Sequence, residues 1–273
     1  MKIQTEIWDN GRLTVNSAFA RLLRHNDITT AQALWTVKSQ GVKETVPDRG
    51  TGKVLLEPME GEGLVETYIK RYQPWTFRNT LKALLSFKKP RVFDGLHEWQ
   101  AILAFHERGL PTMTPIAAAR HGRHTCNLTL GITDYTRASE LVRQDDLSIS
   151  RRHKLVSQIG TIAGRMHRYG FAHQDFYLVH VFIQEEQDDR IFIIDLQRLI
   201  MEKRLPDRWR IKDLAQLLFS AYSHVGKLDI ARFITAYNRA YGKDLREKGM
   251  LDVIEQKALR IERHHRRRYM NLT

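Results

Sequence analysis

The clearest strand pattern in the chain lies at residues 64–72 (LVETYIKRY), where apolar and polar residues alternate. A period of two puts Val65, Thr67 and Ile69 on one face of a strand and Lys70 on the other. The pattern therefore predicts a strand that carries a lysine opposite its apolar face.

The rest of the first half is predicted to hold two more strands and one helix. Residues 53–56 and 125–133 have the apolar character of strands, and residues 94–108 have helical periodicity. The remainder of the first sixty residues looks irregular and is rich in turn residues. Residues 75–90 are basic and aromatic, which is typical of an amphipathic helix, either on a membrane or packed on this half of the protein.

From about residue 134 the pattern becomes helical. Leu155, Ile159, Ile162 and Met166 recur at the spacing of one helix face. A β-hairpin is predicted at residues 179–194, where an acidic turn separates two apolar runs, and helices are expected to follow it. Strands with one helix, then helices around a hairpin, favour an α+β fold with two lobes.

We therefore expect a single domain over residues 1–273. Its N-lobe, residues 1–133, would be small and rich in strands, with residues 1–45 as an N-terminal extension. Its C-lobe, residues 134–273, would be larger and mainly helical and would end in a basic tail at residues 263–268.

The charge balance points to an anionic partner. The 273 residues include 44 Lys and Arg against 31 Asp and Glu, a formal net charge of +13, which suits phosphate, nucleic acid or the inner face of a membrane. The one cysteine, Cys126, excludes an internal disulfide and a cysteine-based zinc site and favours a reducing compartment. No apolar run reaches the roughly 18 residues of a membrane span, and no signal peptide is apparent. We expect a cytoplasmic protein.

Two aspartates stand at positions where a charged side chain costs free energy, so a functional role is expected for each. Asp175 follows a helix and a glycine-containing turn, and Asp195 ends the apolar run of the predicted hairpin. Carboxylates on either side of a hairpin can converge at one end of it. One could then take a proton from a hydroxyl while the other holds a metal, as phosphoryl transfer requires.

Three further residues fit this chemistry. Lys70 can neutralise nucleotide phosphates, and Glu98, on the following helix, can pair with that lysine. His180 stands five positions after Asp175, where a protein kinase has its metal-binding Asn. The order Lys, helix Glu, H-x-D-x-x-x-x-(N/H), then Asp after a hairpin matches the plan of protein kinases.

The segment HQDFYLVHVFI…IFIIDLQRL resembles the lipopolysaccharide kinase family of Gram-negative bacteria, the heptose and Kdo kinases of the inner core. That family has a protein-kinase-like bilobal fold, an H-x-D-x-Y-x-x-H catalytic loop and a D-L-(H/Q)-R element in place of D-F-G. Its lysine strand, its helix and following strand, and its core helix are similar to ETYIKRYQPW, HEWQAILAFHERGLPTMTPIAAAR and RWRIKDLAQLLFSA. The resemblance covers residues 50–225, well over half of the chain.

The resemblance implies an ATP- and Mg²⁺-dependent kinase and assigns the main roles. Asp175 would be the base or orienting group for the acceptor hydroxyl. His173 would be the second catalytic residue of the same loop, with the alternative that it only holds the loop through hydrogen bonds. Asp195 would ligate Mg²⁺, and Lys70, paired with Glu98, would contact the nucleotide phosphates.

Two supporting residues are also implied. His180 would be a second metal ligand or a hydrogen-bonding support, and the second role is favoured because Mg²⁺ prefers oxygen ligands. Asp213 would brace the backbone of the catalytic loop, although a helix-surface charge is the alternative.

Two features depart from the kinase pattern. No G-x-G-x-x-G is present, and Gly50 and Gly52 form only a weak candidate for a phosphate-covering turn. Gln174 replaces the arginine of H-R-D, so control by a phosphorylated activation loop is not expected.

The first hypothesis is a kinase that phosphorylates a heptose or Kdo hydroxyl of the lipid A–core oligosaccharide, peripherally at the cytoplasmic face of the inner membrane. The alternatives are a kinase of the same fold with a protein or small-molecule substrate, a pseudokinase, or a basic binding module. No stable nucleic-acid partner is expected, because no nucleic-acid-binding motif is apparent.

Overall fold

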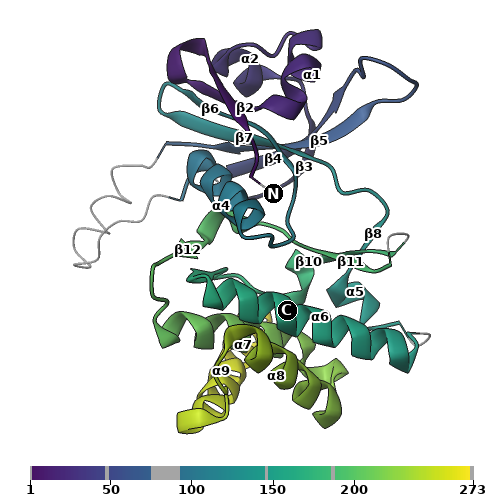
Figure 1. Ribbon diagram of the computed structural model, residues 1–273, viewed down its shortest axis with the longest axis vertical. Helices are drawn as coiled ribbons and strands as arrows, with labels where there is room; N and C mark the ends of the chain where they lie inside the picture. Colours follow the sequence, from purple (N-terminus) through teal and green to yellow (C-terminus); the bar gives the residue numbers. More distant parts are fainter. Residues whose placement is uncertain (1, 47–48, 75–92, 145–146, 186–187, 271–273) are drawn as a thin grey trace. The chain divides into compact units, whose positions relative to one another are not determined.

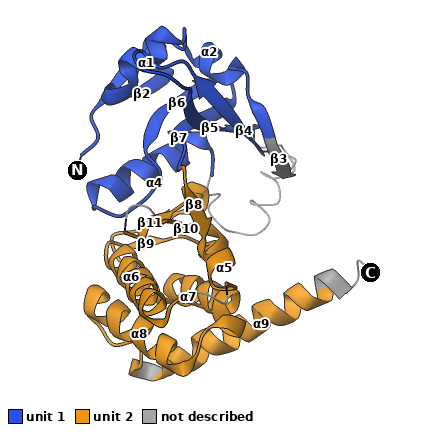
Figure 2. Ribbon diagram, turned by 90° about the vertical axis from the view of Figure 1, so that its right-hand side faces the viewer, with its two compact units in different colours: residues 1–132 blue, residues 133–273 orange. Residues whose placement is uncertain are grey.

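The computed structural model describes residues 2–46, 49–74, 93–144, 147–185 and 188–270. Its contacts divide the chain into two compact units, Met1–Ile132 and Thr133–Thr273, coloured blue and orange in Figure 2. That these units are the two lobes of one domain stays a prediction. The amphipathic helix expected at residues 75–90 lies outside the described residues.

A seven-stranded antiparallel sheet forms the centre of unit 1, in the order β1-β2-β6-β7-β5-β4-β3 (Figure 1). Its strands are β1 (Thr5–Trp8), β2 (Leu13–Asn16), β3 (Gln40–Val46), β4 (Arg49–Leu56), β5 (Val65–Tyr72), β6 (Pro115–His121) and β7 (His124–Leu130). The helices described in unit 1 are α1 (Ala20–His25), α2 (Ala31–Thr36) and α4 (Gly95–Glu107), with short 3-10 turns at Asp9–Gly11 and Ser17–Phe19. The strand predicted at residues 64–72 and the helix predicted at residues 94–108 are therefore confirmed as β5 and α4.

The interpretation of the first sixty residues as irregular is wrong. Leu13, Leu23 and Leu34 are fully buried, and they pack in one hydrophobic core with Ile69 and Leu128 of the central strands. Because β2 pairs with β6, the N-terminal residues extend the sheet on one side. Burial of each such leucine contributes about 1.5–3 kcal/mol to folding, so this segment is an integral part of unit 1.

The glycine pair belongs to a strand. The predicted strand at residues 53–56 begins earlier, at Arg49, and Gly50 and Gly52 lie within β4. A Cβ added at Gly52 would come within 2.6 Å of Ser39 Oγ, so glycine is required where the backbone approaches that side chain.

Helices dominate unit 2. They are α5 (Ala138–Leu141), α6 (Ile149–Arg168), α7 (Asp207–Ala221), α8 (Lys227–Tyr241) and α9 (Met250–Met270), with 3-10 turns at Leu178–His180, Leu196–Arg198, Tyr222–His224 and Glu247–Gly249. Its strands are β8 (Tyr135–Arg137), β9 (Phe171–Ala172), β10 (Val181–Gln184), β11 (Arg190–Ile193) and β12 (Ile200–Met201), which form the sheets β11-β10-β8 and β12-β9. The predicted hairpin is β10–β11.

Two glycines let α6 and α8 pack closely. A Cβ at Gly160 would lie 2.8 Å from the carbonyl oxygen of Phe233, and one at Gly164 would lie 2.6 Å from that of Tyr237. Since these glycines are four residues apart, they share a helix face, and α8 fits against that face. Within the described residues, no helix is both long and apolar enough to cross a lipid bilayer.

Candidate active site

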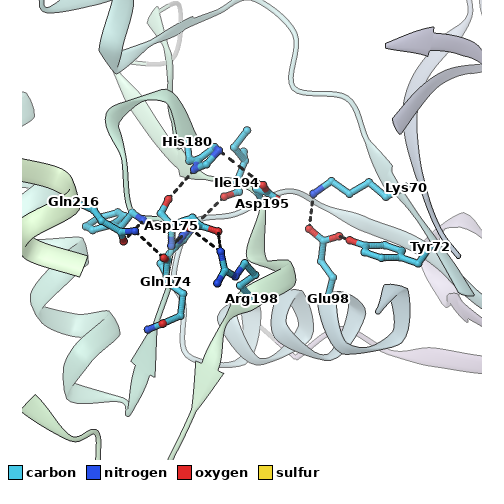
Figure 3. Close-up of polar contacts among 12 residues, drawn as sticks. Lys70, Tyr72, Glu98, Gln174, Asp175, His180, Ile194, Asp195, Arg198 and Gln216 are labelled. Carbon is cyan, nitrogen blue, oxygen red and sulfur yellow. Dashed lines mark hydrogen bonds and ion pairs between the residues drawn. The ribbon is translucent and has the colours of Figure 1, made fainter. Parts of the chain in front are cut away.

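Lys70 and Glu98 form an ion pair in unit 1, with 2.6 Å between Lys70 Nζ and Glu98 Oε1 (Figure 3). The Glu98 side chain is fully buried, and its second oxygen accepts hydrogen bonds from Tyr72 Oη at 2.7 Å and Asn127 Nδ2 at 2.9 Å. A buried carboxylate is tolerated when donors and a cation compensate for lost hydration. The expected Lys70–Glu98 pair is therefore present.

Strand register explains how these groups meet. Lys70 of β5 lies directly opposite Asn127 of β7. Tyr72, two residues after Lys70, shares its face of the strand. Three donors from two neighbouring strands therefore reach the same carboxylate on α4.

The first turn of α4 is held tightly against β7. Gly95 N donates to Thr125 Oγ1 at 2.9 Å, and a Cβ added at Gly95 would lie 3.0 Å from backbone atoms of Cys126. Asp94 caps the helix by accepting a hydrogen bond from His97 N at 2.8 Å. These contacts fix the point at which Glu98 enters the core.

Asp175 lies in a loop of unit 2 and is paired with Arg198. Arg198 Nη1 donates to both Asp175 oxygens, at 3.2 and 3.1 Å (Figure 3). The Asp175 side chain is 24% exposed, so a hydroxyl from outside can reach it. The sequence places Arg198 in the D-L-Q-R element, but its role as the partner of Asp175 is not apparent from spacing alone.

One face of α7 holds the backbone of this loop. Asp213, which is fully buried, accepts hydrogen bonds from His173 N at 2.6 Å and Gln174 N at 2.8 Å. Gln216 Oε1 accepts from Phe176 N at 3.2 Å, and its Nε2 donates to the Gln174 carbonyl at 2.9 Å. The bracing role expected of Asp213 is confirmed, whereas Gln216 is an additional support that sequence reasoning missed.

His173 positions the loop from inside. Its side chain is fully buried; Nε2 donates to the Ile194 carbonyl at 2.9 Å, and Nδ1 accepts from Asp175 N at 3.3 Å. Burial, with a smaller contribution from nearby His180, lowers the pKa of His173 below its usual value. These hydrogen bonds hold the loop as expected of His173, whereas a direct part in catalysis stays a prediction.

His180 links the loop to Asp195. Its Nδ1 donates to the Asp175 carbonyl at 2.7 Å, and its Nε2 lies 3.8 Å from Asp195 Oδ2. Since a carbonyl only accepts, Nδ1 carries the proton, and Nε2 is the nitrogen on the Asp195 side. Asp195 has φ of 62°, a left-handed conformation that aspartate adopts more readily than most residues.

The donor chemistry fits a magnesium site that relies on the substrate. The described residues contain no group of three or more His, Cys, Asp and Glu arranged to hold a metal. Mg²⁺ commonly uses one or two carboxylates together with nucleotide phosphates, and Asp195 is such a carboxylate. The nitrogen of His180 suits a supporting role better than a ligand role.

Each half of the predicted site is therefore assembled within its own unit. Unit 1 brings Lys70 together with Glu98, and unit 2 brings together Asp175, Asp195 and their supporting histidines. Sequence reasoning missed Tyr72 and Asn127 in the first half and Arg198 in the second half. For Asn127 a signal existed, because an amide stands in the middle of a buried strand.

Comparisons with known proteins show which family the chain resembles. A model of the "Lipopolysaccharide kinase (Kdo/WaaP) family" matches residues 32–237. The chain is 30% identical over 213 residues to the lipopolysaccharide core heptose(I) kinase WaaP of Escherichia coli, covering 71% of this chain and 79% of that protein. It is 31% identical over 233 residues to the protein of the same name from Pseudomonas aeruginosa, covering 77% and 86%.

A solved structure is similar over nearly the whole chain. The structure described as WaaP in complex with acyl carrier protein has a TM-score of 0.70 and 27% sequence identity. The match covers 91% of this chain and 98% of that one. The protein-kinase-like fold expected from the sequence is thereby confirmed.

Proposed function

Because the chain belongs to the lipopolysaccharide kinase (Kdo/WaaP) family, and so is a phosphotransferase, we propose that it transfers the γ-phosphoryl group of ATP to a heptose hydroxyl of the lipopolysaccharide inner core. Heptose is preferred to Kdo as the acceptor because the relatives described above are named heptose(I) kinases. The observation that carries the proposal is the partly exposed Asp175, held between Arg198 and the α7-braced loop.

Asp175 would act on the acceptor. One of its carboxylate oxygens takes the proton of the heptose hydroxyl, whose oxygen then attacks the γ-phosphorus as the bond to the β-phosphate oxygen breaks. Arg198 keeps the carboxylate in one orientation, and His173 and His180 hold the backbone on either side of it. Such positioning is the main catalytic resource in phosphoryl transfer.

Lys70 and Asp195 would act on the nucleotide. Lys70, oriented by Glu98, would neutralise phosphate charge, and Asp195 would hold a Mg²⁺ ion. When bound, the ion supplies charge neutralisation of the phosphate oxygens. Asp195 would reach it with an oxygen ligand, which is the type that Mg²⁺ prefers.

A transfer assay tests the proposal. Purified protein, ATP and Mg²⁺ are incubated with an unphosphorylated heptose-containing lipid A–core acceptor, or with a Kdo-only acceptor, and products are analysed by mass spectrometry. We expect one added phosphoryl group on the heptose acceptor and a decrease in rate of about 10²–10⁴-fold in Asp175→Asn. Transfer to Kdo alone would reassign the sugar, and unchanged turnover in Asp175→Asn would refute the catalytic assignment.

The alternatives predict different behaviour with nucleotide. A kinase with another substrate would bind an ATP analogue with Mg²⁺ but leave both glycolipids unmodified. A pseudokinase or a basic binding module would show no Mg²⁺-dependent binding of the analogue. Isothermal titration with a non-hydrolysable ATP analogue, with and without Mg²⁺, separates them. Metal-dependent binding that is lost in Asp195→Ala supports the kinase.

Two partners extend the proposal. The solved WaaP is described as a complex with acyl carrier protein, and we infer that this chain forms a similar complex. The net charge of +13 would also favour the anionic cytoplasmic face of the inner membrane, where the glycolipid acceptor would be met. Co-expression with acyl carrier protein followed by size-exclusion chromatography tests the first inference, and flotation with anionic against neutral vesicles tests the second.

A further inference from the structure

A large groove opens in unit 2 beside the catalytic loop. It has a volume of about 1350 Å³ and lies between α7, α9, the short α5 and the loop residues Tyr177 and Val179. Its volume exceeds the roughly 300–1,000 Å³ of a typical small-ligand pocket, so it can take an extended ligand such as an oligosaccharide. Of its lining residues, only Gln216 was given a role above, as a support of the catalytic loop.

The lining of the groove is strongly basic. Arg143, Lys212, Lys257 and Arg260 all face it, whereas Glu262 is the one acidic residue among its lining residues. That carboxylate lies 2.6 Å from Arg266 on the same helix, so its charge is already paired. The groove therefore presents an excess of positive charge to a ligand.

The sequence of α9 puts this charge on one helix face. Arg260 and Ile261 lie three and four residues after Lys257, and His264 lies four and three residues after them, so these residues share a helix face, and all of them line the groove. Figure 2 shows that α9 extends beyond the other helices of its unit. The wall that α9 contributes therefore lies mostly before the basic tail at residues 263–268, of which only His264 and His265 line the groove.

Aromatic rings add apolar surface to the basic lining of the groove. Tyr177 and Phe219 both line the groove, and their rings meet edge to face with 6.3 Å between centroids. Aromatic faces pack well against the apolar faces of sugar rings, and positive charges around them recognise acidic substituents. Together they fit a saccharide that carries anionic groups.

The groove is continuous with the catalytic loop. Lys212 Nζ donates to Gln174 Oε1 at 3.1 Å, next to Asp175 in sequence, and Gln216 Nε2 donates to Tyr177 Oη at 3.1 Å. Two lining residues of α7 therefore contact the loop that carries the proposed base. A ligand in the groove would be held beside that loop.

We propose that this α7–α9 groove binds an anionic group, a carboxylate or a phosphate, on the acceptor saccharide and so selects acidic oligosaccharides. The identity of the acceptor rests on the proposed function, whereas recognition of an acidic sugar by these residues does not. Lys257 and Arg260 provide charge-assisted hydrogen bonds to the acid, and the aromatic rings support the sugar.

The test compares two double variants of α9 with equal loss of charge. Lys257→Gln/Arg260→Gln alters the groove, and Arg263→Gln/Arg267→Gln alters exposed residues of the same helix that do not line it. Binding of glucose 1-phosphate, glucuronate and glucose is followed by NMR, and the KM for the lipid A–core acceptor is measured with that for ATP.

We expect the groove variant to bind acidic sugars at least tenfold more weakly and to have a KM for the acceptor that is raised by a similar factor. Its KM for ATP should not change, and the control variant should behave like wild type. Preference for glucose 1-phosphate or for glucuronate identifies phosphate or carboxylate as the recognised group. Equal effects in both variants, or no preference of wild type for acidic sugars over glucose, would overturn the inference. Groove-dependent binding without transfer to any glycolipid would uphold it and refute the proposed function instead.

Discussion

Arg198 Nη1 lies 3.2 Å from one carboxylate oxygen of Asp175 and 3.1 Å from the other. A single guanidinium nitrogen thus bridges both oxygens of the proposed base and limits rotation of the carboxylate. Arg198 comes from the short 3-10 turn that directly follows Asp195, so the proposed metal ligand and the residue that orients the base are neighbours in the chain.

Replacing Arg198 is expected to slow the chemical step. In Arg198→Gln the Asp175 carboxylate loses the group that orients it, and kcat should fall about tenfold, a loss of about 1.4 kcal/mol of transition-state stabilisation. Because Arg198 is given no role in nucleotide binding, the KM for ATP should not change. The exposed Arg204→Gln serves as a matched control, and an Arg198→Gln enzyme with wild-type kcat would contradict the orienting role.

The buried Glu98 is expected to control the stability of unit 1. Glu98→Ala leaves Lys70, Tyr72 and Asn127 without their shared acceptor, and the free energy of unfolding should fall by about 3–5 kcal/mol. The exposed Glu107→Ala, on the same helix, should change it by less than about 0.5 kcal/mol. Urea unfolding monitors both variants.

Glu98→Gln separates stability from nucleotide binding. It keeps an acceptor oxygen for the neighbouring donors but removes the charge that orients Lys70, so affinity for the ATP analogue should fall more than stability does. Equal affinity in Glu98→Gln and wild type would mean that Lys70 does not need its partner to bind phosphate.

Asp213 is expected to control the order of the catalytic loop. Asp213→Asn replaces one acceptor oxygen by an amide that cannot accept from a backbone N–H, which costs about 1–3 kcal/mol at a buried site. The amides of His173 and Gln174 should then exchange faster with deuterium, and kcat should fall. Asp207→Asn, at the exposed start of α7, should leave both unchanged. Unaltered exchange in Asp213→Asn would show that Asp213 is not needed to hold the loop.

The sequence predicts those parts of the site whose secondary structure is decided by neighbouring residues. The strand that carries Lys70, the helix that carries Glu98 and the hairpin before Asp195 all follow from periodicity and turns, because neighbouring residues decide them. The contacts of Asn127 and Arg198 depend on register and on chain segments far apart in sequence, which periodicity does not encode. The secondary structure of the first sixty residues is hard to predict from sequence for a related reason. Their short strands and helices are stabilised by tertiary packing and not by local propensity.

Two buried histidines are expected to make stability depend on pH. Burial lowers the pKa of both His167 and His173 below the unfolded value of 6.5, so the folded chain binds these two protons less readily than the unfolded chain does. Below pH 6.5 the unfolded chain binds protons that the folded chain does not. Stability is therefore complete above about pH 7 and declines as pH falls through 6.5, by up to about 1.4 kcal/mol per pH unit for each histidine.

His167→Gln tests this dependence. His167 contacts Tyr237 Oη at 2.8 Å and Asp213 Oδ2 at 3.3 Å, and glutamine preserves hydrogen-bonding capacity without titrating. Urea unfolding at pH 7.5, 6.5 and 5.5 should show a shallower decline in the variant than in wild type, mostly in the lower interval, by at most about 1.4 kcal/mol per pH unit. Ile159→Val, a buried change without a titrating group, lowers stability but should keep the wild-type slope. A His167→Gln slope equal to that of wild type would mean that the folded chain protonates His167 as readily as the unfolded chain does.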